Sequence, residues 1–335
     1  MRWLWYLTIA RLFDGLVVLL AAGFLPWYYL FLRKWGSYRI PLARMNFNEL
    51  IGKGPKDDLR TEIFSDSKDT HNLMCQIGHG FFHPKDAPKM AALALTPKGS
   101  LFRKVPWGFG LPPSRDLISA WTYFYVVCGL KEKHLVESLA SHHWGNVFGL
   151  RDKLGNLSSR AANGGVAFLG NKKVSGPNAG QGYLATAGLL ALAAKELGGK
   201  WKFRYHFYRI MSFGWFWERF PWLPFKGRTY PYVGHTCQMS LYVLHKCGHN
   251  MENGLRWVAV TCQPKQGIQP FVAGMAADCG VLTDKEKANA LQWLLSQNVN
   301  WPQHFDLARW DENCAVYSMY SHCAVQLTSG GKNVD

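Results

Sequence analysis

Apolar residues recur at helical spacing through most of the chain, and strand-like alternation is weak throughout. The clearest example follows the polar stretch 110–116, after which apolar and aromatic side chains mark one helix face through residues 117–130. Pro112 and Pro113 cannot extend a preceding helix, and Ser114 is a favourable N-cap, so a loop is expected to end where this helix begins. Further helices are predicted at residues 69–82, 85–95, 133–148, 181–197, 200–220, 235–247, 254–262, 270–279, 283–297 and 311–327.

Two of these segments carry additional local signals. Residues 181–197 are apolar nearly all round, which is typical of a buried helix. Thr283 and Glu286 have the spacing of a capping box at a helix start. No fixed-period repeat is obvious, but Gly/Pro loops join the helices in hairpin fashion. We therefore expect an all-α domain over residues 69–328, an array of antiparallel helix hairpins, followed by a flexible tail at 329–335.

The amino-terminal region predicts a membrane anchor. Residues 12–32 carry a single charge, Asp14, and the run is long enough to cross a bilayer. Trp and Tyr residues crowd both of its ends, as in an interfacial aromatic belt. We expect a single-pass transmembrane helix within residues 1–36, followed by a basic linker or wrapping arm at 37–68. A buried hydrophobic hairpin is the alternative, and basic residues on both flanks leave the side of the soluble domain open.

Residues 200–220 are rich in aromatic side chains, with seven between Trp201 and Trp217. Two interpretations remain open for this segment. It is either an aromatic core helix or a second contact with a membrane surface, since the following residues 221–225 continue the apolar aromatic character.

Charge and composition limit the classes of molecule that this protein is expected to bind. The formal net charge of +16 favours an acidic partner, which could be nucleic acid, anionic lipid or an acidic polysaccharide. The basic residues are spread over loops with no compact block, so no nucleic acid is expected as a partner. An aromatic content of 15% is enough to line a cleft with rings. The eight cysteines form no CxxC pair, which favours mostly free thiols, and the oligomeric state is left open.

Two polar clusters lie at predicted helix ends. Arg115 and Asp116 lie in or beside the first turn of the helix after Ser114, where they serve either a binding site or only a cap and a salt bridge. His142 and Asn146 are four residues apart and would share a helix face, with Trp144 available to stack on a sugar ring. The alternative for this second cluster is a helix terminus whose polar groups cap the last carbonyls.

The segment 228–235 combines the residue types that β-elimination of a uronic acid needs. Arg228 would pair with the carboxylate, Tyr232 or His235 would remove the C5 proton, and a tyrosine would protonate the leaving oxygen. An ordinary loop with a Tyr-Pro turn is the alternative. Hydrolysis stays open as well, because Asp311 paired with Asp116 across a cleft would supply the two carboxylates of a glycosidase. Asp311 would otherwise only cap the final helix.

Metal and nucleotide chemistry lack support. His235-x-Cys237 and the run from His245 to His249 have no matched second ligand pair, so we expect no metal, and no other cofactor is indicated. The chain contains no GxxxxGK[ST], GxSxG or HExxH motif. The classes of P-loop NTPase, α/β-hydrolase and zincin are therefore not favoured.

The run of antiparallel helices, together with the 110–116 loop followed by residues 121–125, resembles the (α/α)-toroid carbohydrate-active enzymes over about residues 69–327. His143 with Asn146, and Arg228 with Tyr230, Tyr232 and His235, are similar to the Asn/His/Arg/Tyr set of toroid polysaccharide lyases such as alginate lyases. The resemblance implies a toroid fold. The expected catalytic residues are His143, Asn146, Arg228, Tyr232, His235, Asp116 and Asp311, and the expected substrate-binding residues are Arg115, Trp107, Trp121, Trp144 and Arg309.

These observations predict a membrane-anchored enzyme that cleaves an acidic polysaccharide by β-elimination or hydrolysis. If so, the polar clusters before and within the helices should line one cavity. The alternative is a non-catalytic membrane-associated scaffold or a viral envelope-interacting protein, whose aromatic segments contact lipid.

Overall fold

The computed structural model describes residues 77–78, 80–95, 99, 101, 115–147, 179–212, 214–221, 231–261, 270–296 and 322–328. Within these ranges the chain is helical, and the one β-type contact is an isolated bridge between Leu95 and Leu101. The predicted all-α class is confirmed. The named helices are α5 (Ala87–Leu93), α6 (Arg115–Val127), α7 (Lys133–Val147), α8 (Ala179–Leu197), α9 (Lys200–Met211), α10 (Gly214–Arg219), α11 (Pro231–Lys246), α12 (Glu252–Thr261), α13 (Pro270–Asp278) and α14 (Asp284–Ser296).

The predicted anchor at residues 1–36, the linker at 37–68 and the tail at 329–335 lie outside the described residues. None of the described helices combines the length and the apolar character that a membrane-spanning helix requires.

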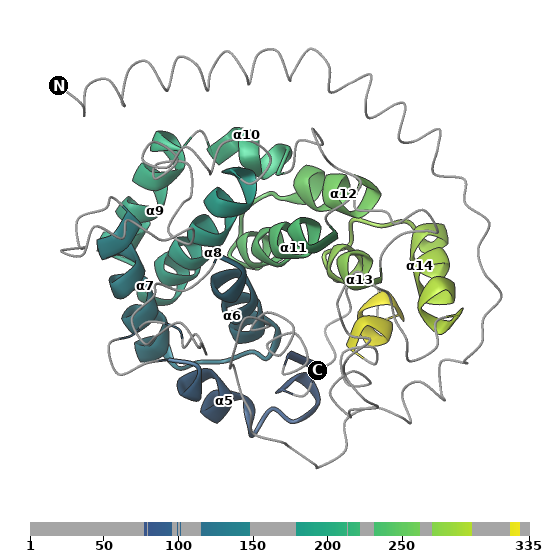
Figure 1. Cartoon of the computed structure of the whole chain (residues 1–335), viewed down its shortest axis with the longest axis horizontal. Helices are drawn as coiled ribbons and strands as arrows, with labels where there is room; N and C mark the ends of the chain where they lie inside the picture. Colours follow the sequence, from purple (N-terminus) through teal and green to yellow (C-terminus); the bar gives the residue numbers. More distant parts are fainter. Residues whose placement is uncertain are drawn as a thin grey trace, which may run out of the picture.

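Helices α6, α8, α11 and α13 form the interior, and α7, α9, α12 and α14 surround them (Figure 1). Every described side chain from 117 to 125, 181 to 194, 234 to 244 and 271 to 277 is buried, so the four interior helices are enclosed on all sides over these stretches. The prediction of a buried helix at 181–197 is confirmed. Each surrounding helix, in contrast, has an exposed face toward solvent.

Three interior helices end in the same turn. Cys128-Gly129, Cys247-Gly248 and Cys279-Gly280 terminate α6, α11 and α13, and each glycine has a positive φ, between 64° and 93°. In all three the glycine N–H donates to the carbonyl three residues back, and the next N–H donates to the carbonyl five residues back. This is the Schellman geometry, which stops a helix and reverses the chain. Each turn therefore sends the chain from an interior helix into an outer one.

The interior helices run parallel to one another, because each outer helix brings the chain back before the next interior helix begins. Gln181 contacts Thr236 near the starts of α8 and α11, and Lys195 contacts Lys246 near their ends. The same ascending order relates α6 to α11 (Ser119 with Ser240, Tyr123 with Tyr242) and α11 to α13 (Gln238 with Val272, Tyr242 with Asp278). All four interior helices thus begin at one end of the molecule.

The helical segments at the two ends of the described chain complete the interior. The ring centroids of Phe81 and His322 lie 4.6 Å apart. A Cβ on Gly80 would collide with the Phe124 ring of α6, and a Cβ on Gly274 of α13 would meet the Gln326 side chain, so glycine permits both close approaches. Residues 77–82 and 322–328 therefore join α6 and α13 from the two ends of the chain (Figure 1).

The sequence prediction of one helix over residues 200–220 is wrong. The structure divides this segment into α9 and α10, with Ser212 as the C-cap of α9. Arg209 contacts Glu218 across the break, although residues nine apart in one continuous helix would be separated by about 13 Å along its axis. A Cβ on Gly214 would collide with the Tyr183 hydroxyl, so a glycine at the first position of α10 lets this helix fold back against α8.

Candidate functional site

The two ends of the interior helices differ in their connections. The chain leaves the interior helices through the short segments 128–132, 198–199, 247–251 and 279–283. It enters α6, α8, α11 and α13 through 94–114, 148–178, 220–230 and 262–269, and 297–321 leads into the helical residues 322–328. Long connections carried on one end of a rigid scaffold are where binding and catalytic residues concentrate. We refer to this end, where α6, α8, α11 and α13 begin, as the long-connection end.

The backbone positions of several predicted site residues lie at that end. Arg115 and Asp116 are the first two residues of α6, and Tyr232 is the second residue of α11. Asn146 lies in the last turn of α7. Helix α7 runs antiparallel to α8, because Glu137 contacts Lys200 just after the end of α8 and His143 contacts Thr186 in its first half. Helix polarity thus places the backbones of Arg115, Asp116, Asn146 and Tyr232 toward one end of the molecule. Whether their side chains line a cavity stays a prediction.

His143 lies in the interior beside the starting half of α8. Its side chain is buried, and its Nε2 lies 2.9 Å from the Thr186 hydroxyl. Burial lowers the pKa of His143 to about 3, and the neighbouring His142 acts in the same direction. The imidazole is therefore neutral at neutral pH, and it links α7 to α8 through a hydrogen bond. In this position His143 suits a positioning role better than contact with a substrate.

His235 and Trp121 are also enclosed. The His235 ring lies on α11 with its centroid 5.6 Å from that of Phe271, an edge-on contact with α13. The Trp121 indole N–H donates to the carbonyl of Ala91 at 3.1 Å and so ties α6 to α5. Because both rings are fully buried, neither presents a face to a ligand in this conformation.

Trp144 is half-buried near the end of α7, and its ring is occupied on one side. The guanidinium of Arg204 on α9 lies 5.2 Å from the Trp144 ring and 4.6 Å from that of Trp201. Such cation–π contacts are favourable by about 0.5–1 kcal/mol each at partly exposed sites. Arg115 is likewise half-buried.

The side chains of the remaining predicted residues lie outside the described part of the structure. Trp107, Arg228, Arg309 and Asp311 fall in segments that the structure does not describe, and for Asp116, Asn146 and Tyr232 only the backbone is described. Their catalytic and binding roles stay predictions.

A set of buried hydrogen bonds between the interior helices was not predicted from the sequence. The Gln181 amide donates to the Thr236 hydroxyl at 2.6 Å, and the Ser240 hydroxyl donates to that of Ser119 at 2.9 Å. The Gln238 amide donates to carbonyls of α12 and α13. The available signal was the presence of polar residues on helices that are otherwise apolar on every face, which indicates hydrogen bonds to neighbouring helices. Their partners are distant in sequence, so the pattern alone could not pair them.

A second buried group lies where residues 322–328 meet α6. The Tyr123 hydroxyl lies 3.0 Å from His322 Nε2 and accepts a hydrogen bond from the Gln326 amide at 2.9 Å. Burial raises the pKa of Tyr123 and lowers that of His322 to about 4, so both are neutral near neutral pH. Like neutral His143, Tyr123 and His322 are therefore buried polar groups that carry no charge near neutral pH. Hydrogen bonding and helix positioning are what this arrangement can provide.

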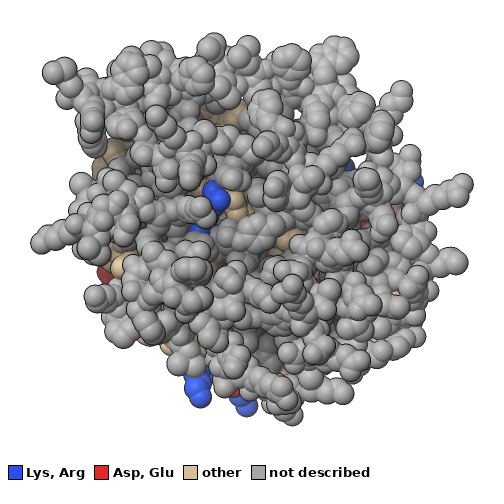
Figure 2. Space-filling model, in the orientation of Figure 1, with Lys and Arg blue, Asp and Glu red and all other residues tan. Residues whose placement is uncertain are grey.

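Metal ligation has no candidate site in the described ranges, because no cluster of three or more His, Cys, Asp or Glu side chains there could hold a metal ion. Among the described residues that reach the face shown in Figure 2, blue Lys and Arg side chains are more prominent than red Asp and Glu. This agrees with the basic excess of the whole sequence.

Comparison with known proteins found no matching family model, no matching curated protein and no matching solved structure.

Proposed function

We propose that this chain is an (α/α)-toroid enzyme that binds an acidic polysaccharide at the long-connection end and cleaves it. The observation that carries the proposal is the parallel set of interior helices, because α6 and α11 then begin at one end, with Arg115, Asp116 and Tyr232 in their first turns. The net charge of +16 suits a polyanionic substrate. Residues 1–36 are proposed to anchor the enzyme to a membrane as a single pass, with its side left open.

Elimination is the reaction that the residue types favour. Arg228 would neutralise the uronate carboxylate and so acidify the C5 proton. As a nearby base removes that proton, the C4–O bond breaks and a tyrosine protonates the leaving oxygen. His235 is enclosed beside Phe271, whereas Tyr232 lies one turn closer to the start of α11, so Tyr232 is the better candidate base. His143 would hold α7 against α8 and thereby position Asn146.

The test is a panel of acidic and neutral polysaccharides incubated with the full-length protein. Absorbance of unsaturated uronates reports elimination, and new reducing ends report cleavage by either route. We expect unsaturated product from a uronate polymer. Tyr232→Phe and Arg228→Gln should each lower the rate by about 100-fold or more if they act in the chemical step. Lys133→Gln, which removes a charge at the opposite end of the molecule, is the matched control and should leave the rate unchanged.

Two results would change the proposal. New reducing ends without unsaturated product would identify the reaction as hydrolysis and not elimination. Asp116 and Asp311 would then be the next residues to replace. If no polysaccharide in the panel yields either product, the enzyme proposal fails for those substrates, and a membrane-associated scaffold becomes the better description.

A further inference from the structure

Helix α9 carries two apolar stripes on opposite faces. Trp201, Tyr205 and Tyr208 form the buried stripe, which faces the interior. Phe203 and Ile210, seven residues apart, belong to the other stripe and are 70% and 74% exposed. An amphipathic outer helix of a soluble domain needs only one apolar stripe, so the second requires a separate explanation.

The neighbouring helix extends this surface. Trp215 on α10 is 58% exposed, and Phe207 stacks on Phe203 with a centroid separation of 5.9 Å. We refer to Phe203, Phe207, Ile210 and Trp215 as the α9–α10 apolar surface.

The surface is held rigidly from beneath. Arg209 donates to both carboxylate oxygens of Glu218, which also accepts a hydrogen bond from the Tyr183 hydroxyl at 2.7 Å. Glu218 is only 5% exposed, so this ion pair is anchored in the interior and fixes α10 against α9 and α8. Trp215 is therefore presented in a set position beside the end of α9.

The charges around this surface are basic. Lys202 and Arg219 are exposed, and Lys200, also exposed, lies 3.8 Å from Glu137 of α7. The sole acid on α9 and α10 is Glu218, which is buried and paired with Arg209. An aromatic and aliphatic surface with a basic border complements an anionic bilayer, where apolar side chains enter the boundary between headgroups and acyl chains. Ile210, as an aliphatic side chain, offers nothing that would recognise a sugar ring.

From this geometry we infer that the α9–α10 apolar surface docks on an anionic lipid bilayer, with Phe203, Ile210 and Trp215 entering the interface and Lys202 and Arg219 contacting lipid phosphates. This membrane contact is separate from the predicted amino-terminal anchor and does not depend on the proposed enzymatic function. It would hold the domain flat on the surface rather than leave it tethered through residues 37–68 alone.

The test measures partitioning of the full-length protein onto vesicles of phosphatidylcholine with or without phosphatidylserine. The lipid concentration is set so that about half of the wild-type protein binds. A Phe203→Ser/Ile210→Ser variant should bind at least about tenfold more weakly, because it removes most of the apolar area that enters the interface. A Lys202→Gln/Arg219→Gln variant should lose about fivefold per charge, only on vesicles with phosphatidylserine.

The matched control is Lys89→Gln/Lys285→Gln, which removes the same charge from exposed positions of two other helices, α5 and α14. All variants retain the amino-terminal segment, so any difference between them comes from the helices. Equal binding of all variants would overturn the inference. Self-association in sedimentation that the Phe203→Ser/Ile210→Ser variant abolishes, with vesicle binding unchanged, would overturn it in favour of a second copy of the chain.

Discussion

Helices α9 and α14 occupy equivalent places in the fold but are stabilised differently. Each is an outer helix that follows an interior helix through a short turn, and each is near an Arg–Glu ion pair. The start of α14 is capped by side chains, and its exposed positions include the charged residues Asp284 and Lys285. The start of α9 has Gly199 as N-cap without a side-chain hydrogen bond, and its exposed positions include the large apolar residues Phe203, Phe207 and Ile210.

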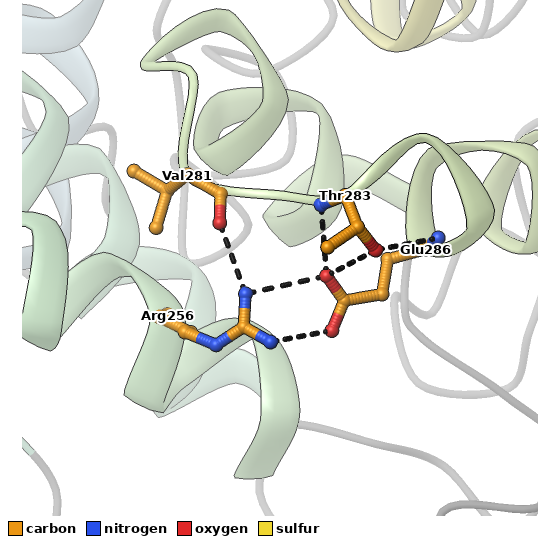
Figure 3. A network of polar contacts seen from close by, with 4 residues as sticks. All are labelled: Arg256, Val281, Thr283 and Glu286. Atoms are coloured by element: carbon orange, nitrogen blue, oxygen red, sulfur yellow. Dashed lines mark hydrogen bonds and ion pairs between the residues drawn. The ribbon is translucent and has the colours of Figure 1, made fainter.

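The start of α14 shows how an ordinary surface helix is secured (Figure 3). Glu286 Oε2 accepts hydrogen bonds from the N–H and the hydroxyl of Thr283, and the Glu286 N–H donates back to that hydroxyl. Arg256 of α12 binds both oxygens of Glu286 and donates to the Val281 carbonyl at 3.0 Å. The predicted capping box is confirmed, and a residue from a neighbouring helix reinforces it.

The difference indicates what each helix depends on. Local hydrogen bonds at its own start help to fix α14, and the charged residues on its outer face are solvated. Helix α9 depends on tertiary contacts, namely the buried stripe and the Arg209–Glu218 pair, and it exposes an apolar stripe to solvent.

The largest effect should come from the two arginines. Arg209→Ala would leave Glu218 buried with one hydrogen-bond donor, so we expect the free energy of unfolding to fall by about 3 kcal/mol. Arg256→Ala should cost only about 1 kcal/mol, because Glu286 is 22% exposed and keeps its Thr283 contacts. Denaturant unfolding of both variants measures the contrast. Adding Glu218→Gln to Arg209→Ala should restore part of the loss, and equal losses for the two arginines would refute the distinction.

The capping box should have an intermediate effect. Thr283→Ala removes the hydroxyl at the start of α14 and should lower the free energy of unfolding by about 1 kcal/mol. Thr283→Ser keeps the hydroxyl and should stay within a few tenths of a kcal/mol of wild type. Thermal unfolding of the pair is a sufficient measurement. An alanine variant as stable as the serine variant would mean that the observed hydrogen bonds do not help to fix this helix.

The smallest effect should appear as a pH dependence. Burial would raise the pKa of Glu286, but the Thr283 N–H, its hydroxyl and Arg256 together lower it below 4.5. A carboxyl whose pKa is lowered on folding stabilises the protein above its unfolded pKa, and this contribution is lost as the pH falls through the folded value. The stability difference between wild type and Glu286→Gln should therefore be constant from about pH 7 to pH 5 and shrink below about pH 4.5. A difference that grows on acidification would contradict the assignment.

The sequence predicted the elements better than their relationships. Helix starts and ends came within a few residues, since periodicity and capping are local, as at Thr283. The repeated turn was overlooked although Cys-Gly occurs at 128–129, 247–248 and 279–280, because the unequal connections between the hairpins hide any fixed period. The break before Gly214 and the partners of Gln181 and Ser240 depend on contacts between distant residues, which periodicity does not encode.

For the candidate site, the sequence pointed to Arg115, Asp116, Asn146 and Tyr232, whose backbones lie toward one end of the molecule. It could not tell that His143, His235 and Trp121 would be enclosed. Histidine and tryptophan serve equally as buried hydrogen-bonding groups and as ligand contacts, and only the surrounding helices decide between the two.

The parallel direction of the interior helices has an electrostatic consequence for the backbone itself. Each helix carries about half a positive elementary charge at its start, from peptide dipoles that add along its axis. Helices α6, α8, α11 and α13 all begin at the long-connection end, so these partial charges gather around the middle of that end. The outer helices run the opposite way and confine the field to this central region. A polyanion that reached the helix starts would be attracted by these peptide groups in addition to any basic side chain.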